Sequence, residues 1–291
     1  MSGYRLTSAL VLAAISLLPA AARADAPSLQ VAPLQYTGNL TSGKIANGYV
    51  DVSNPSDTTI QISADVQGFR QTGHNGSLQF FPDPDLSAGI KADLTSFSLG
   101  PREALRDVFS IDPSKLPQGG VYAAIFFRTQ AANQASSSSF VTESANVGTL
   151  LILTNGGPGA HRGVITGLKL PFWQFGSGLH GGVIGFENTD HSKVAVAFTP
   201  KLITAVLPWG RTAATNSGLI LPGIARQFTF ARPGSYLGLL PVTVTDGDTG
   251  SHRTSWVLAL TGVYMWLLPL LVIAGLVTLK LRSIKRTTSQ K

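Results

Sequence analysis

The chain has 291 residues, of which 22 are lysine or arginine and 15 are aspartate or glutamate, so its formal charge is +7 at pH 7. Seven of the basic residues lie in the two terminal segments, and the other 15 balance the 15 acidic residues found between Asp25 and Asp248. This neutrality removes the electrostatic basis for nucleic-acid binding, which needs a basic surface. The absence of cysteine excludes disulfides, thiolate metal ligands and cysteine nucleophiles.

Residues 1–24 have the pattern of a secretory signal peptide. Arg5 precedes an apolar run from Leu6 to Leu18, and Ala22-Arg23-Ala24 forms an A-x-A cleavage site. The apolar run is too short to span a bilayer as a helix. We therefore expect the chain from Asp25 onward to be exported.

The exported region has the hydrophobic pattern of β-strands. Apolar and polar residues alternate from Ile60 to Gln67, which places one set on a core face and the other in water. Val121 to Phe127 and Val147 to Leu153 are nearly continuous apolar runs, as in strands covered on both faces. Pairs of glycine, proline and asparagine separate the runs at short intervals. The pattern predicts an all-β fold.

An internal repeat divides this region into two units. The segment Gly48 to Ile62 aligns with Gly182 to Val196 at a constant offset of 134, and Asn54 and Asn188 occupy matching positions. In each copy an alternating strand ends in asparagine and resumes after a short polar turn. This pattern predicts a hairpin whose turn is closed by the asparagine side chain.

The repeat predicts two immunoglobulin-like β-sandwiches in tandem, at residues 25–157 and 158–252. We expect their boundary in the glycine-rich stretch Asn155 to His161. Within the first unit, Thr129 to Asn146 is polar and rich in serine, which predicts a long exposed loop of the kind used for binding. The partner-binding residues predicted in this loop are Asn133, Gln134, Ser137 and Phe140.

Motifs for cofactors and metals are weak. Gly176 to Gly181 matches G-x-G-x-x-G, but a strand follows it where nucleotide binding needs a helix, so a glycine-rich connection is favoured. Asp246-Gly-Asp248 resembles the start of a calcium loop, but Val257 stands where the bidentate acid is needed, which favours a polar turn. The histidines lack zinc-site spacing. The sequence predicts no cofactor and no metal site.

Catalytic motifs are equally weak, and we predict no catalytic residue and no enzyme activity. One alternative remains open, which is a glycan-modifying enzyme with a cleft and paired acids. Asp83 and Asp85, on either side of a proline, would be candidates for that pair.

Aromatic residues cluster near the start of the second unit. Trp173 and Phe175 lie in the segment Leu170 to Phe175, and Trp209 lies in a later loop. Exposed aromatic side chains can anchor a protein partner or a glycan ring. We favour the interpretation that Trp173 and Phe175 cover the core or the seam between the two units, because sandwiches bury such residues routinely.

The stretch Trp256 to Leu279 contains no charged residue and is followed by a basic tail at residues 280–291. As a helix, 24 residues cover about 36 Å, enough for a hydrocarbon layer of ~30 Å. The positive-inside rule then predicts a single-pass protein of the cell membrane, with extracellular N-terminal domains and a cytoplasmic tail. The residues expected at the membrane interfaces are Trp256, Trp266, Lys280, Arg282, Lys285 and Arg286.

Several short motifs resemble the WxL-interacting proteins of Gram-positive cell surfaces. Val31-Ala-Pro33 and Pro117 to Ile125 are similar to the first module of that family, and Ile184 to Asn188 and Pro233 to Tyr236 are similar to its second module. The signal, two β-domains, anchor and basic tail extend the resemblance over the whole chain. It implies a non-catalytic role in adhesion or scaffolding, with peptidoglycan and secreted WxL-domain proteins as partners. Periplasmic pilus chaperones share the strand pairing around an asparagine turn.

The sequence therefore predicts a non-catalytic, membrane-anchored surface protein that binds cell-wall polymer, other surface proteins, or both. The alternative is a membrane-tethered, chaperone-like assembly factor that lends a strand to exported subunits. This alternative requires an exposed, unpaired edge strand in the fold.

Overall fold

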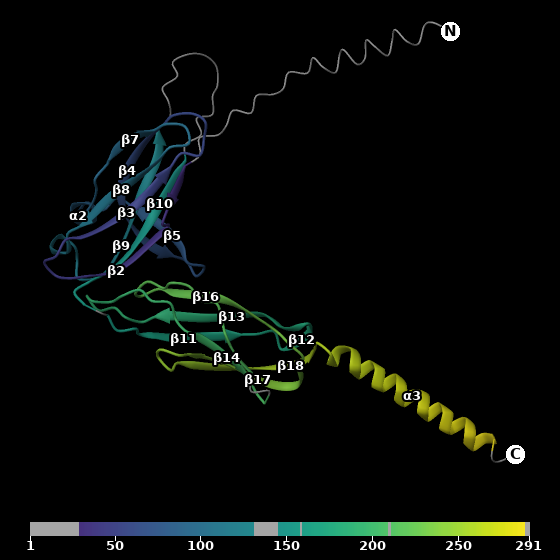
Figure 1. The fold of residues 1–291 in the computed structure, drawn as a ribbon. Helices are drawn as coiled ribbons and strands as arrows, with labels where there is room; N and C mark the ends of the chain where they lie inside the picture. The colour runs from purple at the N-terminus through teal and green to yellow at the C-terminus, as the bar shows by residue number, and fades with distance from the viewer. Residues whose placement is uncertain (1–28, 131–144, 158, 209–210, 289–291) are drawn as a thin grey trace, which may run out of the picture.

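The computed structural model describes residues 29–130, 145–157, 159–208 and 211–288. These residues form two β-sandwiches in succession and a C-terminal helix that extends away from the second one (Figure 1). The predicted all-β fold is confirmed. The predicted signal peptide, residues 1–24, lies outside the described residues.

The first sandwich consists of two sheets. Its strands are β1 (Gln30–Ala32), β2 (Gln35–Leu40), β3 (Ala46–Ser53), β4 (Ile60–Thr72), β5 (Ser77–Phe81), β6 (Ile90–Ala92), β7 (Ser96–Leu99), β8 (Ala104–Ile111), β9 (Gly119–Gln130) and β10 (Asn146–Asn155). The short helices α2 (Pro84–Gly89) and η1 (Pro113–Lys115) lie between strands. One sheet has the order β1-β3-β8-β6, and the other has the order β2-β10-β9-β4, with β5 and β7 both pairing with β4.

The second sandwich repeats this plan with fewer strands. Its elements are β11 (Gly163–Lys169), β12 (Trp173–Gly176), β13 (Gly178–Asn188), β14 (Leu202–Val206), β15 (Arg211–Ala214), β16 (Ala225–Pro233), β17 (Leu237–Asp246) and β18 (His252–Thr261). Its sheets have the orders β11-β13-β16 and β12-β18-β17-β14-β15. In each sandwich the last strand pairs in parallel with an early one, β10 with β2 and β18 with β12.

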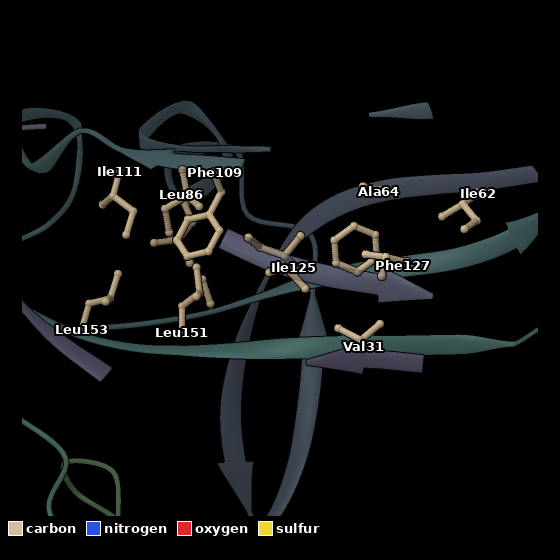
Figure 2. Packing of buried hydrophobic residues seen from close by; sticks show 14 of the residues in the cluster. Val31, Ile62, Ala64, Leu86, Phe109, Ile111, Ile125, Phe127, Leu151 and Leu153 are labelled. Atoms are coloured by element: carbon tan, nitrogen blue, oxygen red, sulfur yellow. The ribbon is translucent and has the colours of Figure 1, made fainter. Parts of the chain in front are cut away.

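The apolar face of each strand forms the core, as the alternation predicts. In the first sandwich Phe109, Ile125, Phe127 and Leu151 are fully buried between the sheets (Figure 2). They come from β8, β9 and β10, so strands of both sheets contribute to the centre of the core. A separate cluster around Phe186, Tyr236 and other residues fills the second sandwich.

The internal repeat is structural, but the predicted hairpins are wrong. β3 and β4 belong to different sheets, so the turn after Asn54 carries the chain across the sandwich. Asn54 is 1% exposed, and its Nδ2 donates to the carbonyls of Thr58 (2.7 Å) and Gly100 (2.8 Å). Asn188 is 0% exposed and donates to Val196 O (3.0 Å). Each asparagine thus closes a crossover between sheets.

The β4–β5 hairpin joins the two sandwiches. Gln71, on β4, donates from Nε2 to Leu219 O (2.8 Å) and accepts at Oε1 from Leu221 N (3.0 Å). At the hairpin tip, His74 O accepts from Gln227 N on β16 at 2.7 Å. The covalent connection runs from β10 to β11, and the predicted boundary stretch, Asn155 to His161, begins at the last residue of β10 and continues into this connection. The sandwiches therefore meet through backbone and side-chain hydrogen bonds as well as through the linker.

The predicted bounds of the second unit and of the membrane helix are both wrong at residues 252–261. These residues form β18, whose Val257 and Ala259 are buried in the second core. The helix α3 (Tyr264–Thr288) begins only after Gly262 and Val263. The uncharged stretch from Trp256 is therefore divided between a core strand and a helix. Within the described residues, no helix has the length and apolar character needed to cross a membrane.

The connection between β18 and α3 is tightly held. Gly262 has a φ of 60°, and a Cβ there would collide with Ser235. Val263 N donates to Ser235 Oγ at 3.0 Å. A residue with a side chain would meet both a left-handed backbone and this contact, so position 262 requires glycine.

Candidate functional site

β10 is paired on both sides along only part of its length. Its whole length pairs with β9, whereas β2 begins to pair only at Leu150. Leu150 N donates to Leu34 O at 2.9 Å on the β2 side. Because backbone groups alternate along a strand, the N–H and C=O groups of Asn146 and Gly148 point to the same side. Among the described residues no strand pairs with β10 at those two positions.

An apolar groove lies beside this open edge. It has a volume of about 600 Å³, and its lining residues come from β1, β3, β8 and β10, together with the turn after β1. They are Gln30, Val31, Ala32, Leu34, Asp51, Ser53, Ala104 and Val147. An added strand that paired with β10 would place every second side chain into this groove.

β18 is the counterpart of β10 in the second sandwich. Leu258 N donates to Phe172 O at 2.7 Å, as Leu150 N does to Leu34 O, so the two strands align at an offset of 108. β12 pairs with β18 from Leu258 onward, which leaves His252 to Val257 open on that side among the described residues. Each sandwich therefore has one half-open last strand.

A second hollow lies where the hairpin tip meets the second sandwich. It also has a volume of about 600 Å³, and two arginines from β16 contribute to its lining. Arg226 donates to Leu219 O (2.6 Å) and Asn75 O (3.1 Å), and Arg232 donates to Thr204 O (2.8 Å). Burial lowers the pKa of Arg226 below its usual value. These contacts show the arginines holding backbone carbonyls, a structural role.

One buried acid in the first sandwich has a strongly shifted pKa. Asp107, on β8, is 2% exposed and accepts from Leu94 N at 3.1 Å. Burial of the carboxyl group raises its pKa to about 6, and the nearby charge of Asp93 adds to the shift. The carboxyl therefore titrates far above an ordinary aspartate.

The predicted motif residues mostly have structural roles. Asp83 Oδ1 accepts from Asp85 N and Leu86 N, both at 3.1 Å, and so caps α2. Asp246 holds a turn by accepting from Thr249 N (3.2 Å), and Gly176 to Gly181 connects β12 with β13. In the described part of the chain, no three histidines or acids lie close enough together to hold a metal ion.

The predicted binding residues fall in a part of the chain that the structure does not describe. Asn133, Gln134, Ser137 and Phe140 lie outside the described residues. Of the six predicted interface residues, Trp256 lies on β18, whereas the other five, Trp266, Lys280, Arg282, Lys285 and Arg286, lie on α3.

The favoured interpretation of the aromatic pair is wrong. Trp173 is 60% exposed and Phe175 is 52% exposed, on β12 near the start of α3 and far from the first sandwich (Figure 1). Their rings stack with centroids 6.3 Å apart. The sequence carried no signal for this, because the polar Gln174 between them is the residue that faces the core, the reverse of the usual alternation.

No family model matches the chain, and no curated protein matches it in sequence. Among solved structures, it is similar to the class 5 fimbriae chaperone CfaA, with 11% identity and a TM-score of 0.42, over 80% of this chain and 100% of that one. It is also similar to the E. coli chaperone DraB, with 14% identity and a TM-score of 0.41, over 81% of this chain and 97% of that one. The resemblance to WxL-interacting proteins stays a prediction.

Proposed function

We propose that this protein is a non-catalytic assembly factor that binds exported proteins by pairing an extended segment of the client with β10. The observation that carries the proposal is the open edge at Asn146 and Gly148 beside an apolar groove. Backbone hydrogen bonds along such an edge supply affinity for any extended chain, and the groove selects side chains at alternate positions.

The chemistry of the groove indicates the class of client. Val31, Leu34 and Val147 offer apolar contact, and Gln30, Asp51 and Ser53 add polar groups to the lining. An extended segment with alternating apolar residues fits this surface, and such a segment is exposed in a β-rich subunit that has not completed its sheet. The predicted signal peptide would place the protein among exported clients.

The other half-open strand is less suited to this role. His252, Arg253 and Thr254 on β18 are exposed and polar. A client strand placed there would gain backbone bonds but little apolar burial. The difference favours the first sandwich as the site of client binding.

Site-specific photo-crosslinking tests the proposal. A photoreactive phenylalanine analogue replaces Asn146 in the full chain, and the same analogue replaces Thr254, the matched position on β18. Expressed in its host, the chain should form adducts with exported proteins from position 146 and few from position 254. Adducts in equal amounts at both positions would contradict the proposal.

A variant that introduces a charge into the groove is the second part of this experiment. Val147→Asp should reduce the adducts from position 146 several-fold, because a client would have to bury an unpaired carboxylate. Ser255→Asp, at the matched position of β18, should leave them unchanged. A chain that gives no protein adduct and instead sediments with purified cell walls would support the cell-wall adhesion function.

A further inference from the structure

The outer face of the β12-β18-β17 sheet carries a patch of exposed large apolar side chains near α3. Trp256 is 56% exposed, and Leu237 and Leu239 of β17 are also exposed. Trp173 and Phe175 continue the patch onto β12. We call these five residues the aromatic face.

The sheet register makes the aromatic face continuous. Trp173 pairs with Leu258, which pairs with Leu239, and one step along the same face Phe175 pairs with Leu260, which pairs with Leu237. Trp256 pairs with Pro241. All these residues lie on one face, since their positions alternate with buried ones along each strand.

The same face becomes polar with distance from α3. Beyond Trp256 and Pro241, Thr254 and Thr243 pair, and their hydroxyl oxygens lie 2.9 Å apart. His252 and Thr245 follow. The apolar character is thus confined to the end of the sheet from which the helix leaves.

Comparison with the first sandwich shows that the fold does not require aromatic residues on this face. The offset that aligns Leu34 with Phe172 places Gln35 at the position of Trp173 and Thr37 at that of Phe175. Gly148 stands where β18 has Trp256. Ordinary polar or small residues suffice at these positions, so the aromatic residues serve something outside the sandwich.

The properties of α3, which follows β18, indicate what covers the aromatic face. Every residue of α3 from Trp266 to Lys280 is exposed, and apolar residues face all directions around its axis. A helix that is apolar on all sides requires either a large protein core or a lipid environment. The aromatic face is continuous with this helix through the fixed connection at Gly262 and Val263. Tryptophan on such a surface matches the boundary between lipid headgroups and acyl chains.

We propose that the aromatic face lies in the headgroup region of a lipid bilayer, with α3 in contact with the acyl chains. The second sandwich then contacts the membrane through the end of the β12-β18-β17 sheet that lies nearest α3. The threonine pair of β17 and β18 marks the level at which the sheet enters water. This inference is independent of client binding, which involves the other sandwich.

Tryptophan quenching by brominated lipid tests the contact in the full chain. The four tryptophans are reduced to Trp256 alone by Trp→Phe changes at 173, 209 and 266. A control chain has all four changed to Phe and carries Thr243→Trp, on the same face but farther from α3. In vesicles of phosphatidylethanolamine and phosphatidylglycerol with brominated chains, Trp256 should be quenched several-fold more than the tryptophan at 243.

Equal quenching at the two positions overturns the proposal. A second outcome would also overturn it. If vesicles left the fluorescence of Trp256 unaffected, and only exported proteins or further copies of the chain shielded it, the face would be a protein interface.

A second variant separates the aromatic face from α3. Trp173→Gln with Phe175→Thr installs the residues of the first sandwich and leaves α3 intact. Vesicle partitioning should fall about tenfold, because two large exposed rings lose their apolar contact. The melting temperature should not change, which excludes misfolding as the cause. Unchanged partitioning would overturn the role of the face, whether or not the client crosslinks at position 146 are found.

Discussion

β10 and β18 have the same place in their two sandwiches but present different surfaces. Both pair in parallel with an early strand from matching leucines, Leu150 and Leu258, and both leave their first residues open on one side within the described chain. Beside β10 the open edge borders an apolar groove, whereas β18 is polar at its open edge and aromatic on its outer face. The same strand position can therefore present different surfaces, because different residues form the edge and the outer face.

The strongest way to test the equivalence of the sandwiches is to remove their buried asparagines. Asn54→Ala should destabilise the first sandwich by about 3 kcal/mol, because Thr58 O, Leu99 O and Gly100 O each lose one donor. Asn188→Ala should destabilise the second by about 2 kcal/mol, because it removes fewer bonds. Calorimetry of each variant should show one transition lowered and the other nearly constant.

A matched control for these variants is Asn39→Ala, which changes an exposed asparagine of β2. It should change stability by less than about 0.5 kcal/mol. If Asn54→Ala and Asn188→Ala lowered both transitions equally, the two sandwiches would be one cooperative unit.

Asp107 should make the first sandwich, but not the second, depend on pH. Its pKa is raised to about 6 in the folded state, so the folded state holds a proton that the unfolded state releases near pH 4. Stability should therefore fall as pH rises from about 4 to 6 and then level off, with a total loss of about 3 kcal/mol. Asp107→Asn should remove this slope.

Urea unfolding at pH 4.5 and pH 7.5 provides the measurement. Asp107→Asn should match the wild-type chain at the lower pH and exceed its stability at the higher pH. A variant less stable than wild type at pH 7.5 would show that the carboxylate is favourable in the fold. The transition of the second sandwich should be the same in both proteins.

The smallest expected effect concerns the junction. Gln71→Ala removes two hydrogen bonds between the sandwiches and should weaken their coupling by about 1 to 2 kcal/mol. The two calorimetric transitions should then move apart by a few degrees. Gln61→Ala, at an exposed position of the same strand, is the control. If the spacing between the two transitions did not change in Gln71→Ala, the coupling between the sandwiches would come from the backbone contact between His74 and Gln227.

Much of the fold could be predicted from local patterns. The alternation from Ile60 to Gln67 identified β4, and the aligned Asn54 and Asn188 identified the repeat. The hairpin prediction failed because a polar turn has the same sequence whether it joins strands within a sheet or across a sandwich. The prediction of where the second sandwich ends was wrong for a related reason. Strand and helix are both apolar from Trp256 to Leu279, and only Gly262 marks the change.

The candidate site depends on contacts that a sequence does not display. The opening at Asn146 and Gly148 exists because β2 pairs only from Leu150 onward, a consequence of tertiary pairing. Val147 looks like any apolar residue of a covered strand. Trp173 and Phe175 resemble ordinary core aromatics in the sequence, and their exposure depends on which face of β12 meets the core.

The two-residue connection at Gly262 and Val263 also determines how a mechanical load would pass through the molecule. A pull on α3 enters the fold at the end of β18, next to the bond between Val263 N and Ser235 Oγ. β18 is paired with β17 from His252 to Leu260, and the bonds between them are perpendicular to the strands. A force along β18 therefore loads all of these bonds in shear at once, and they share the tension instead of opening one after another.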